Sequence, residues 1–375
     1  MLRPSYLDYN ATAPVKPEVV AAMAAALERT GNPSSVHGFG REARRQLERA
    51  RAAVAALVGA APGQVVFTSG GTEANNQVLC GARGPVVTSA VEHDSVLAAV
   101  PGAARAAVDA EGRIDLAHLE GQLARTSPTL VSVMLANNET GVIQPVGDVV
   151  GLARRHGARV HCDAVQAGGK LAIDLAALGV DFLALSAHKL GGPQGVGALV
   201  LGGGVEPAAL LRGGGQERRW RPGTENLPGI VGFGRACELA MADADWRRRT
   251  GTLRDGLEAR IRAIAPGAQV LGGGAERLPN TSCLTMPGVG NQTQLIEFDL
   301  AGIAVSTGSA CSSGKVGPSH VLAAMAVDPA AAATAIRVSF GWASTADDVE
   351  RFALVWSRLY ARTRRPERRR MPEPA

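Results

Sequence analysis

The sequence predicts an α/β protein built on a mostly parallel sheet. Between about residues 62 and 201, short apolar runs alternate with helical patterns, as in a sheet whose strands are joined by helices. Aromatic residues make up only 4% of the chain, whereas glycine occurs 46 times, and this composition favours a core of Ala, Val and Leu over an all-β sandwich. The length of 375 residues, 46% of them hydrophobic, indicates a large buried core and two or three domains.

The expected strands are short apolar runs, and ligand motifs follow several of them. The runs cover residues 65–68, 86–88, 130–135, 159–162, 182–185 and 198–201. Polar or glycine-rich segments come directly after several of these runs. Because open α/β sheets hold their ligands at the carboxyl ends of the strands, we expect the functional site at this edge.

The helical patterns divide the chain into two domains. An amphipathic helix is expected over residues 41–58, and a long charged helix over residues 246–264. A glycine-rich turn at residues 272–274 and further short elements follow the second helix. We therefore expect a large domain over residues 11–245 and a smaller α+β domain made of residues 1–10 and 246–375, which includes a basic C-terminal tail.

The positive charge of the chain lies near its C-terminal end. The formal net charge is +5, and residues 358–375 contain seven Arg and two Glu, so the rest of the chain is neutral. No aromatic residue alternates with the Arg cluster at residues 364–370. We interpret this segment as a solvated tail and expect no nucleic-acid partner.

The cysteines and the N-terminus favour a soluble cytoplasmic protein. The five cysteines are odd in number, widely spaced and without a C-x-x-C pair, which argues against a disulfide framework or a structural zinc site. The first ten residues contain no apolar signal region, and the longest uncharged stretch, residues 190–205, is too rich in glycine for a membrane span. We expect a reducing compartment, no metal and no membrane association.

A candidate anion site lies where residues 69–76, SGGTEANN, follow an expected strand and begin a helix. Free backbone N–H groups and the helix dipole favour a phosphate at such a position. A plain turn with a threonine cap accounts for the same residues equally well. The run is not a Walker loop, because no Lys-Ser/Thr pair follows the glycines.

A candidate amine and a candidate acid follow two other strands. The chain has only four lysines, and Lys189 comes just after a buried strand, where desolvation would lower its pKa and favour Schiff-base formation. A surface lysine in a glycine-rich loop is the alternative. Asp163 ends another apolar strand, where a buried carboxylate needs a cationic partner such as a pyridinium nitrogen. In isolation a helix N-cap is the simpler interpretation of Asp163, and a metal site with His161 is a further one.

Three more residues are candidates for the same site. His93 follows a strand and suits ring stacking or proton transfer, although a single His is more often structural. Asn138 is one of two adjacent Asn residues after a strand, so a ligand or a tight turn must satisfy its amide. Cys311 lies in a Gly/Ser-rich stretch that should expose its thiol for nucleophilic work, although an incidental exposed thiol has the same signature.

Taken together, these segments resemble the cysteine desulfurases of the NifS/IscS type, a branch of the class V aminotransferase-like enzymes that depend on pyridoxal 5'-phosphate (PLP). The resemblance runs from Tyr6 to about Gly341. It rests on the SGGTEANN, NNETG, DAVQ and SAHK runs and on residues 6–12, 31–37, 213–217, 221–226 and 309–314. It implies a fold-type I PLP-dependent transferase, with a mostly parallel seven-stranded sheet in the large domain and a smaller α+β domain.

The resemblance also implies the roles of the residues around the cofactor. Lys189 would bind PLP covalently, Asp163 would pair with its pyridine nitrogen, and Gln166 would contact its phenolate oxygen. His93 would stack on the ring and shuttle protons. The residues implied to bind the phosphate are Gly71, Thr72, Ser186 and His188, together with Thr224 from a second subunit, which implies a homodimer.

The substrate residues follow from the same resemblance. Asn138 and Arg337 match the positions that hold the carboxylate of L-cysteine. Cys311 matches the nucleophile, so the implied products are alanine and a Cys311 persulfide that is passed to a sulfur-acceptor protein, such as an iron–sulfur scaffold. The sequence departs from the family pattern at Ala13 and at residues 315–317, and the second departure affects loop contacts with an acceptor.

Two other kinds of function are compatible with these segments. The first is a selenocysteine lyase, or a PLP-dependent aminotransferase or lyase of the same fold in which Cys311 has no role. The second is a non-catalytic phosphate-binding or iron–sulfur assembly subunit that retains only the fold, and the intact Lys189 argues against it.

Overall fold

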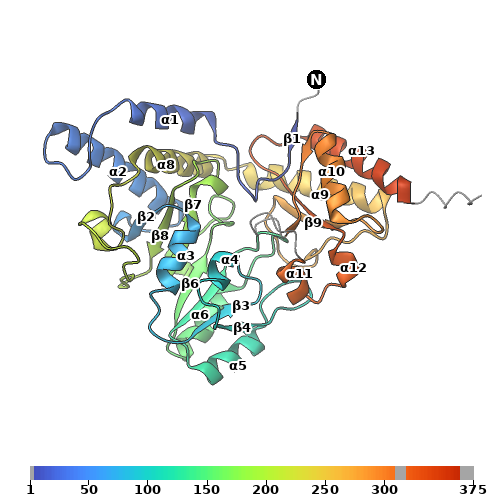
Figure 1. Cartoon of the computed structure of the whole chain (residues 1–375), viewed down its shortest axis with the longest axis horizontal. Helices are drawn as coiled ribbons and strands as arrows, with labels where there is room; N and C mark the ends of the chain where they lie inside the picture. The colour runs from blue at the N-terminus through green and yellow to red at the C-terminus, as the bar shows by residue number, and fades with distance from the viewer. Residues whose placement is uncertain (1–3, 309–317, 364–375) are drawn as a thin grey trace, which may run out of the picture.

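The computed structural model describes residues 4–308 and 318–363, and its two parts lie side by side (Figure 1). The larger part contains a central sheet with helices on both faces. The smaller part contains two short sheets against which further helices pack. Cys311 falls outside the described residues.

Within these described ranges, seven strands form the central sheet in the order β2-β8-β7-β6-β5-β3-β4. The strands are β2 (Val65–Thr68), β3 (Val86–Ser89), β4 (Ala104–Ala106), β5 (Leu130–Met134), β6 (Arg159–Asp163), β7 (Phe182–Ser186) and β8 (Gly197–Leu201). Neighbouring strands pair in parallel except at β8, which is antiparallel to both β2 and β7. The predicted mostly parallel, seven-stranded sheet is confirmed.

The predicted strands all occur, and their bounds differ from the prediction by at most one residue. Strand β6 ends one residue later than predicted because Asp163 still pairs with Met134 and Ala184 on the neighbouring strands. Strand β4 was not predicted, because its three residues, Ala-Arg-Ala, contain no apolar run. Strand β4 is an edge strand of the sheet, so its backbone pairs with a neighbouring strand on one side only.

Helices cover both faces of the central sheet. Helices α1, α2, α5, α6 and α8 contribute to the core on one face, and α3 and α4 contribute to the core on the other. Helix α2 begins three residues earlier than predicted because the side chain of His37 caps it by accepting a hydrogen bond from the N–H of Gly40 at 3.2 Å. The helices of this part are α1 (Pro17–Leu27), α2 (Gly38–Leu57), α3 (Gly71–Leu79), α4 (Asp94–Leu97), α5 (Leu116–Thr126), α6 (Val146–Arg155), α7 (Leu175–Leu178) and α8 (Leu227–Ala242), with single 3-10 turns η1 (Pro62–Gln64), η2 (Ala187–Lys189) and η3 (Gln216–Arg219).

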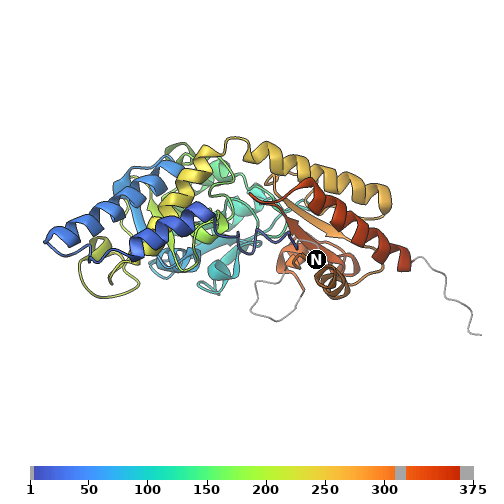
Figure 2. The same ribbon diagram turned by 90° about the horizontal axis from the view of Figure 1, so that it is seen from above.

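The smaller part is built from both ends of the chain. Strand β1 (Ser5–Tyr6) pairs with β10 (Ile303–Ala304) in parallel, and β9 (Thr281–Thr285) pairs with β11 (Ala335–Ser339) in antiparallel orientation. The long helices α9 (Trp246–Ile264) and α13 (Ala346–Thr363) lie next to each other over this part (Figure 2). The shorter helices are α10 (Asn291–Leu300), α11 (His320–Ala324) and α12 (Pro329–Ala332).

The hydrophobic cores support the proposed division into two domains. Leu7 packs in one buried cluster with residues of α9, α10 and α13, such as Leu257, Phe298 and Trp356. This cluster is separate from the cores on the two faces of the central sheet. We therefore propose a small domain that contains residues 1–10 and the chain beyond residue 245. None of the helices in the described part of the chain is long and apolar enough to cross a membrane.

Candidate active site

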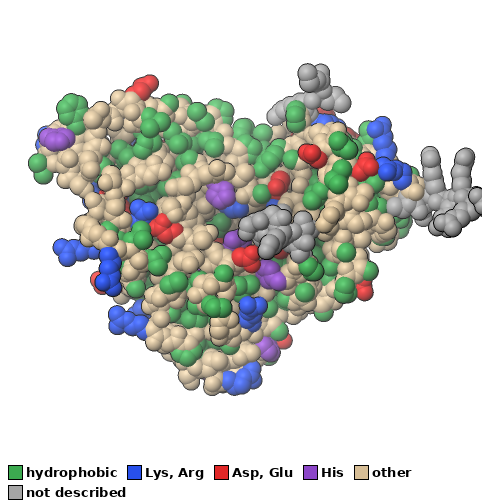
Figure 3. Space-filling view, viewed as in Figure 1, with side chains coloured by type: hydrophobic (Ala, Val, Ile, Leu, Met, Phe, Trp, Pro, Cys, Tyr) green, Lys and Arg blue, Asp and Glu red, His purple; other side chains and the backbone are tan. Residues whose placement is uncertain are grey.

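A cavity of about 280 Å³ lies at the carboxyl ends of the parallel strands. This volume is near the lower end of the range for small-molecule sites. On the face shown in Figure 3, histidine side chains gather at the junction of the two domains. The predicted site residues that line the cavity are Gly71, Thr72, His93, Asn138, Asp163, Gln166, Ser186, His188 and Lys189.

The carboxylate of Asp163 is buried at the end of β6, with 6% of the residue exposed. One oxygen accepts a hydrogen bond from the side-chain amide of Asn75 at 2.7 Å, and the other accepts one from the N–H of Val165 at 2.9 Å. Among residues 4–308 and 318–363, no Lys, Arg or His forms an ion pair with this carboxylate. A buried carboxylate that has only neutral donors favours a cationic ligand in the cavity.

The amine of Lys189 lies at the wall of the same cavity. Strand β7 leads directly into the 3-10 turn η2, which ends at Lys189. The Nζ atom donates to the backbone oxygens of Asn10 and Ala11 at 2.7 and 2.8 Å. The structure therefore brings the predicted amine and the predicted acid, which lie at the carboxyl ends of two adjacent parallel strands or just beyond them, to one cavity.

The N-terminus of helix α3 lines the cavity through Gly71 and Thr72. Gly71 and Thr72 begin the nine-residue helix, so their N–H groups have no intrahelical acceptor. A Cβ atom added to Gly71 would lie 2.5 Å from Cγ2 of Val165, so glycine is required for this close packing. Ser186 and His188 enter from the end of β7. Burial, followed by the charges of Lys189 and Lys170, lowers the pKa of His188 to about 4, so its imidazole is neutral at physiological pH.

The side chain of His93 is fixed by a helix cap. His93 is the N-cap of α4, and its Nδ1 atom accepts a hydrogen bond from the N–H of Ser95 at 3.1 Å. The hydroxyl oxygen of Ser95 lies 2.9 Å from the same nitrogen. Because Nδ1 accepts from a backbone N–H, the proton of the neutral ring resides on Nε2. His93 thus presents an oriented imidazole at the cavity wall.

A buried polar network lies behind the cavity and centres on Asn10, which is fully buried. The backbone oxygen of Asn10 accepts hydrogen bonds from Nζ of Lys189 and from Nε2 of Gln166, at 2.7 and 2.9 Å. Its side-chain oxygen accepts one from Nζ of Lys170 at 2.8 Å. Its side-chain nitrogen donates to the backbone oxygen of Asn138 at 3.2 Å. Asn10 therefore connects predicted residues from three different strand ends.

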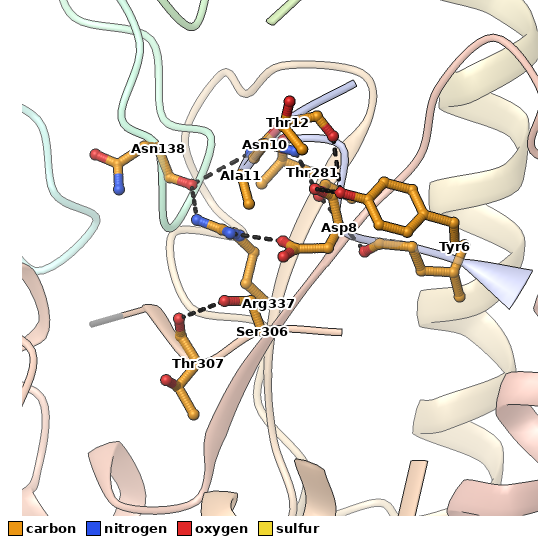
Figure 4. A network of polar contacts seen from close by, with 12 residues as sticks. Tyr6, Asp8, Asn10, Ala11, Thr12, Asn138, Thr281, Ser306, Thr307 and Arg337 are labelled. Carbon is orange, nitrogen blue, oxygen red and sulfur yellow. Dashed lines mark hydrogen bonds and ion pairs between the residues drawn. The ribbon is translucent and has the colours of Figure 1, made fainter. Parts of the chain in front are cut away.

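Arg337 does not line the cavity itself but lies directly behind Asn138. Its fully buried guanidinium donates to the backbone oxygen of Asn138 at 3.0 Å and to the carboxylate of Asp8 at 2.7 Å. Figure 4 shows the guanidinium between these two acceptors, while the side-chain amide of Asn138 points away from it. Arg337 comes from β11 in the small domain, so the two domains meet at this point.

One predicted residue lies away from this cavity, and another falls outside the described residues. Thr224 is exposed and does not line the cavity of its own chain. It lies in the segment between η3 and α8, where Gly223 has a φ of 106°. Cys311 belongs to the part of the chain that the structure does not describe, so its predicted role stays a prediction.

Sequence reasoning did not assign a role to four residues of this region. Asn75 contacts Asp163, Asp8 contacts Arg337, and Asn10 and Lys170 form the buried network. Asn75, Asp8 and Asn10 belong to the runs that carried the family resemblance, and this was the available signal. Lys170 had a weaker signal, because it follows Gln166 by four residues and is one of only four lysines.

The sequence pattern of the family described as "Aminotransferase class-V" matches residues 5–352. The chain belongs to this family. Among its relatives, a cysteine desulfurase of Cereibacter sphaeroides is 48% identical over 92% of this chain and 93% of its own length. A cysteine desulfurase IscS of Dictyoglomus turgidum is 40% identical over 97% of this chain and 96% of its own length.

Solved structures place the chain in the same family. The structure of a NifS-like protein of Rickettsia africae matches 96% of this chain and 100% of its own, with a TM-score of 0.89 and 34% sequence identity. The protein SspA, solved in complex with cysteine, matches 90% of this chain and 99% of its own, with a TM-score of 0.79 and 31% identity. These similarities confirm the predicted class-V aminotransferase family and its fold-type I architecture.

Proposed function

We propose that this protein is a PLP-dependent cysteine desulfurase that converts L-cysteine to alanine and a Cys311 persulfide. The observation that carries the proposal is the buried carboxylate of Asp163, which has no cationic partner in the described chain and lines one cavity with the amine of Lys189. A protonated pyridine ring supplies the missing cation. The relatives that are named cysteine desulfurases cover nearly the whole chain, which supports the choice of reaction.

The residues of the cavity fit PLP at each of its polar groups. Asp163 would hold the ring nitrogen, and the amine of Lys189 would attach the cofactor covalently. The N–H groups at the start of α3, with Ser186 and His188, would hold the phosphate. Gln166 would donate to the ring oxygen, and His93 would lie against the ring. When bound, PLP supplies an electron sink for negative charge at the α-carbon of an amino acid.

The substrate would be held by residues at the domain junction. The guanidinium of Arg337 donates to the backbone oxygen of Asn138 at 3.0 Å, and a guanidinium suits the carboxylate of an amino acid. Lys189 and His93 are the candidate groups that move the α-proton. The thiolate of Cys311 would then attack the sulfur of the bound cysteine, so that an S–S bond forms as the C–S bond breaks. The bonding electron pair and a proton go to carbon, and alanine leaves.

We also propose that the protein is a homodimer that passes its sulfur to an acceptor protein such as an iron–sulfur scaffold. Thr224 is exposed on its own chain and would complete the phosphate site of the second subunit. Apolar side chains that lie exposed on α1, on α2 and between them, such as Leu27, Val36 and Phe39, are candidates for the subunit contact.

The decisive experiment incubates the PLP-loaded protein with L-cysteine and a thiol reductant, and measures alanine and sulfide. We expect equal amounts of the two products. The variant C311S should keep the visible absorption of bound PLP and lose sulfide release. A fully active C311S would refute the persulfide role, and a protein that takes up no PLP would refute the proposed enzyme.

The same assay separates the related functions. Activity on selenocysteine without activity on cysteine would indicate a selenocysteine lyase. Formation of a keto acid in place of alanine and sulfide would indicate an aminotransferase. Each of these outcomes contradicts the desulfurase assignment while leaving the PLP site intact.

A further inference from the structure

Lys170 is a buried lysine that the proposed reaction does not use. Only 4% of the residue is exposed. Its Nζ atom donates hydrogen bonds to the side-chain oxygens of Asn10 and Gln166, at 2.8 and 2.9 Å. Among the described residues, these two amides are the only hydrogen-bond partners of Nζ, and no carboxylate forms an ion pair with this atom.

The amine determines which end of the Gln166 amide faces the cavity. The amide oxygen accepts from Lys170, and the amide nitrogen donates to the backbone oxygen of Asn10 at 2.9 Å. An amide nitrogen has two hydrogens, so the second remains for a ligand in the cavity that Gln166 lines. If the amide of Gln166 were flipped, its NH2 group would face the amine of Lys170 and its oxygen would face the backbone oxygen of Asn10. A donor would then meet a donor and an acceptor would meet an acceptor, so both contacts would be repulsive.

The same amine fixes the orientation of Asn10. With its oxygen on Lys170, the side chain of Asn10 turns its nitrogen toward the backbone oxygen of Asn138 at 3.2 Å and the hydroxyl of Thr281 at 2.9 Å. The backbone oxygen of Asn10 then accepts from Lys189. One buried amine thus orients two amides that contact the proposed cofactor residues.

The buried position of this amine also affects its pKa. Burial lowers the pKa of Lys170 well below its usual value, and the positive charges of Lys189 and Arg337 lower it further. The two amide oxygens that accept from the amine are therefore the groups that satisfy it in this buried place.

We propose that Lys170 is a positioning residue that fixes the amide of Gln166 so that an N–H group, and not the carbonyl, faces the ring oxygen of the bound cofactor. The inference rests on the proposed PLP site. It does not depend on the substrate, because the orientation of Gln166 is set before any amino acid binds.

The test measures the pH midpoint of the visible absorption of PLP bound to the protein, without substrate. In the variant K170M the side chain keeps its length and loses both donors. We expect the midpoint to rise by about one pH unit or more, which corresponds to one lost hydrogen bond to a charged oxygen. The variant K16M is the matched control, because Lys16 is a partly buried lysine that lines a small pocket with Lys170 and Lys189, while the hydrogen bonds to the two amides come from Lys170. Its midpoint should equal that of the wild type.

Further variants show whether Lys170 acts through Gln166. In a Q166L background, K170M should add no further shift. K170Q, which restores an N–H donor, should have a midpoint between those of K170M and the wild type. The proposal is overturned by a wild-type midpoint in folded, PLP-loaded K170M, by a K170Q midpoint no closer to the wild type than that of K170M, or by an undiminished shift in the Q166L background. If K170M does not fold, a wild-type midpoint in Q166L overturns the proposal. A wild type that titrates as expected but releases no sulfide counts against the desulfurase assignment alone.

Discussion

Arg337 and Asp8 form an ion pair of 2.7 Å between strand β11 and the segment that follows strand β1. The arginine side chain is 1% exposed and that of the aspartate 18% exposed. The carboxylate of Asp8 thus holds one edge of the guanidinium that we propose for the substrate carboxylate (Figure 4). We therefore propose that Asp8 acts on the substrate through Arg337.

The variant D8N tests this arrangement. The amide keeps the shape of the side chain but loses its charge, so Arg337 is held less firmly. We expect the KM for L-cysteine to rise about tenfold with a smaller change in kcat, since a hydrogen bond to a charged group contributes about 1.5–3 kcal/mol. The control is D109N, whose partner Arg113 lies 3.7 Å away at the surface. An unchanged KM in D8N would contradict the positioning role.

The variant N75A tests the support of Asp163. It removes the 2.7 Å hydrogen bond from the Asn75 amide to the buried carboxylate. We expect PLP to bind about tenfold more weakly, because the ionised carboxylate loses a donor in a buried site. Equilibrium titration of the protein with PLP, followed by absorbance, measures the effect. N76A is the control, since Asn76 bonds to the backbone oxygens of Thr72 and Ser95 and not to Asp163. Equal PLP affinities in the two variants would exclude this role of Asn75.

A fully buried histidine should limit stability at acid pH. Burial lowers the pKa of His161 to about 4, below its value of about 6.5 in an unfolded chain. The unfolded chain therefore binds the proton more tightly than the folded one. The contribution of neutral His161 to the free energy of unfolding is complete above about pH 6.5 and is lost as the pH falls toward 4. The full loss is about 3 kcal/mol by this linkage.

Thermal unfolding between pH 7 and pH 4 measures this effect. The Tm of the wild type should fall more steeply than that of H161L, which has no imidazole to protonate. The exposed His37 supplies the control H37N, which keeps a side-chain acceptor for the helix cap of α2. H37N should follow the wild type. Parallel curves for the wild type and H161L would show that another group dominates acid unfolding.

A buried ion pair supports the segment that precedes Thr224. The guanidinium of Arg51 binds the carboxylate of Glu217 at 2.6 Å, with 6% and 2% of the side chains exposed. The same carboxylate accepts from the N–H of Phe67 at 2.8 Å. R51M leaves the carboxylate buried without its cation, so we expect a loss of about 3–5 kcal/mol in the free energy of unfolding. Chemical denaturation measures it, with R45M as the exposed control, because Arg45 is paired only at the surface. A similar small effect in both variants would be inconsistent with this reasoning.

The sheet and most of the cavity were predictable from the sequence because their signals are local. Six of the seven strands of the central sheet were recognisable as apolar runs, and Asp163 and Lys189 come soon after two of these runs. Parallel pairing then brings their ends to one edge of the sheet. The residue roles came from the family resemblance, and the cavity is compatible with them.

The contacts around Asn10 were not predictable, because they join segments that are far apart in the chain. Its partners Lys170 and Thr281 lie 160 and 271 residues away. No periodicity or local propensity encodes such a pairing. The direction of a buried amide, such as that of Gln166, likewise depends on the complete set of donors and acceptors around it.

The short segment from Tyr6 to Asn10 joins a sheet of the small domain to the wall of the cavity in the large one. The amide N–H of Asn10 donates to the hydroxyl of Ser339 on β11, while its carbonyl accepts from Lys189. A rotation of the small domain relative to the large one would therefore move the acceptors of the Lys189 amine, which we propose as the attachment point of the cofactor. Interdomain motion and the position of that amine are thus mechanically linked through the segment that contains Asn10 and Ala11.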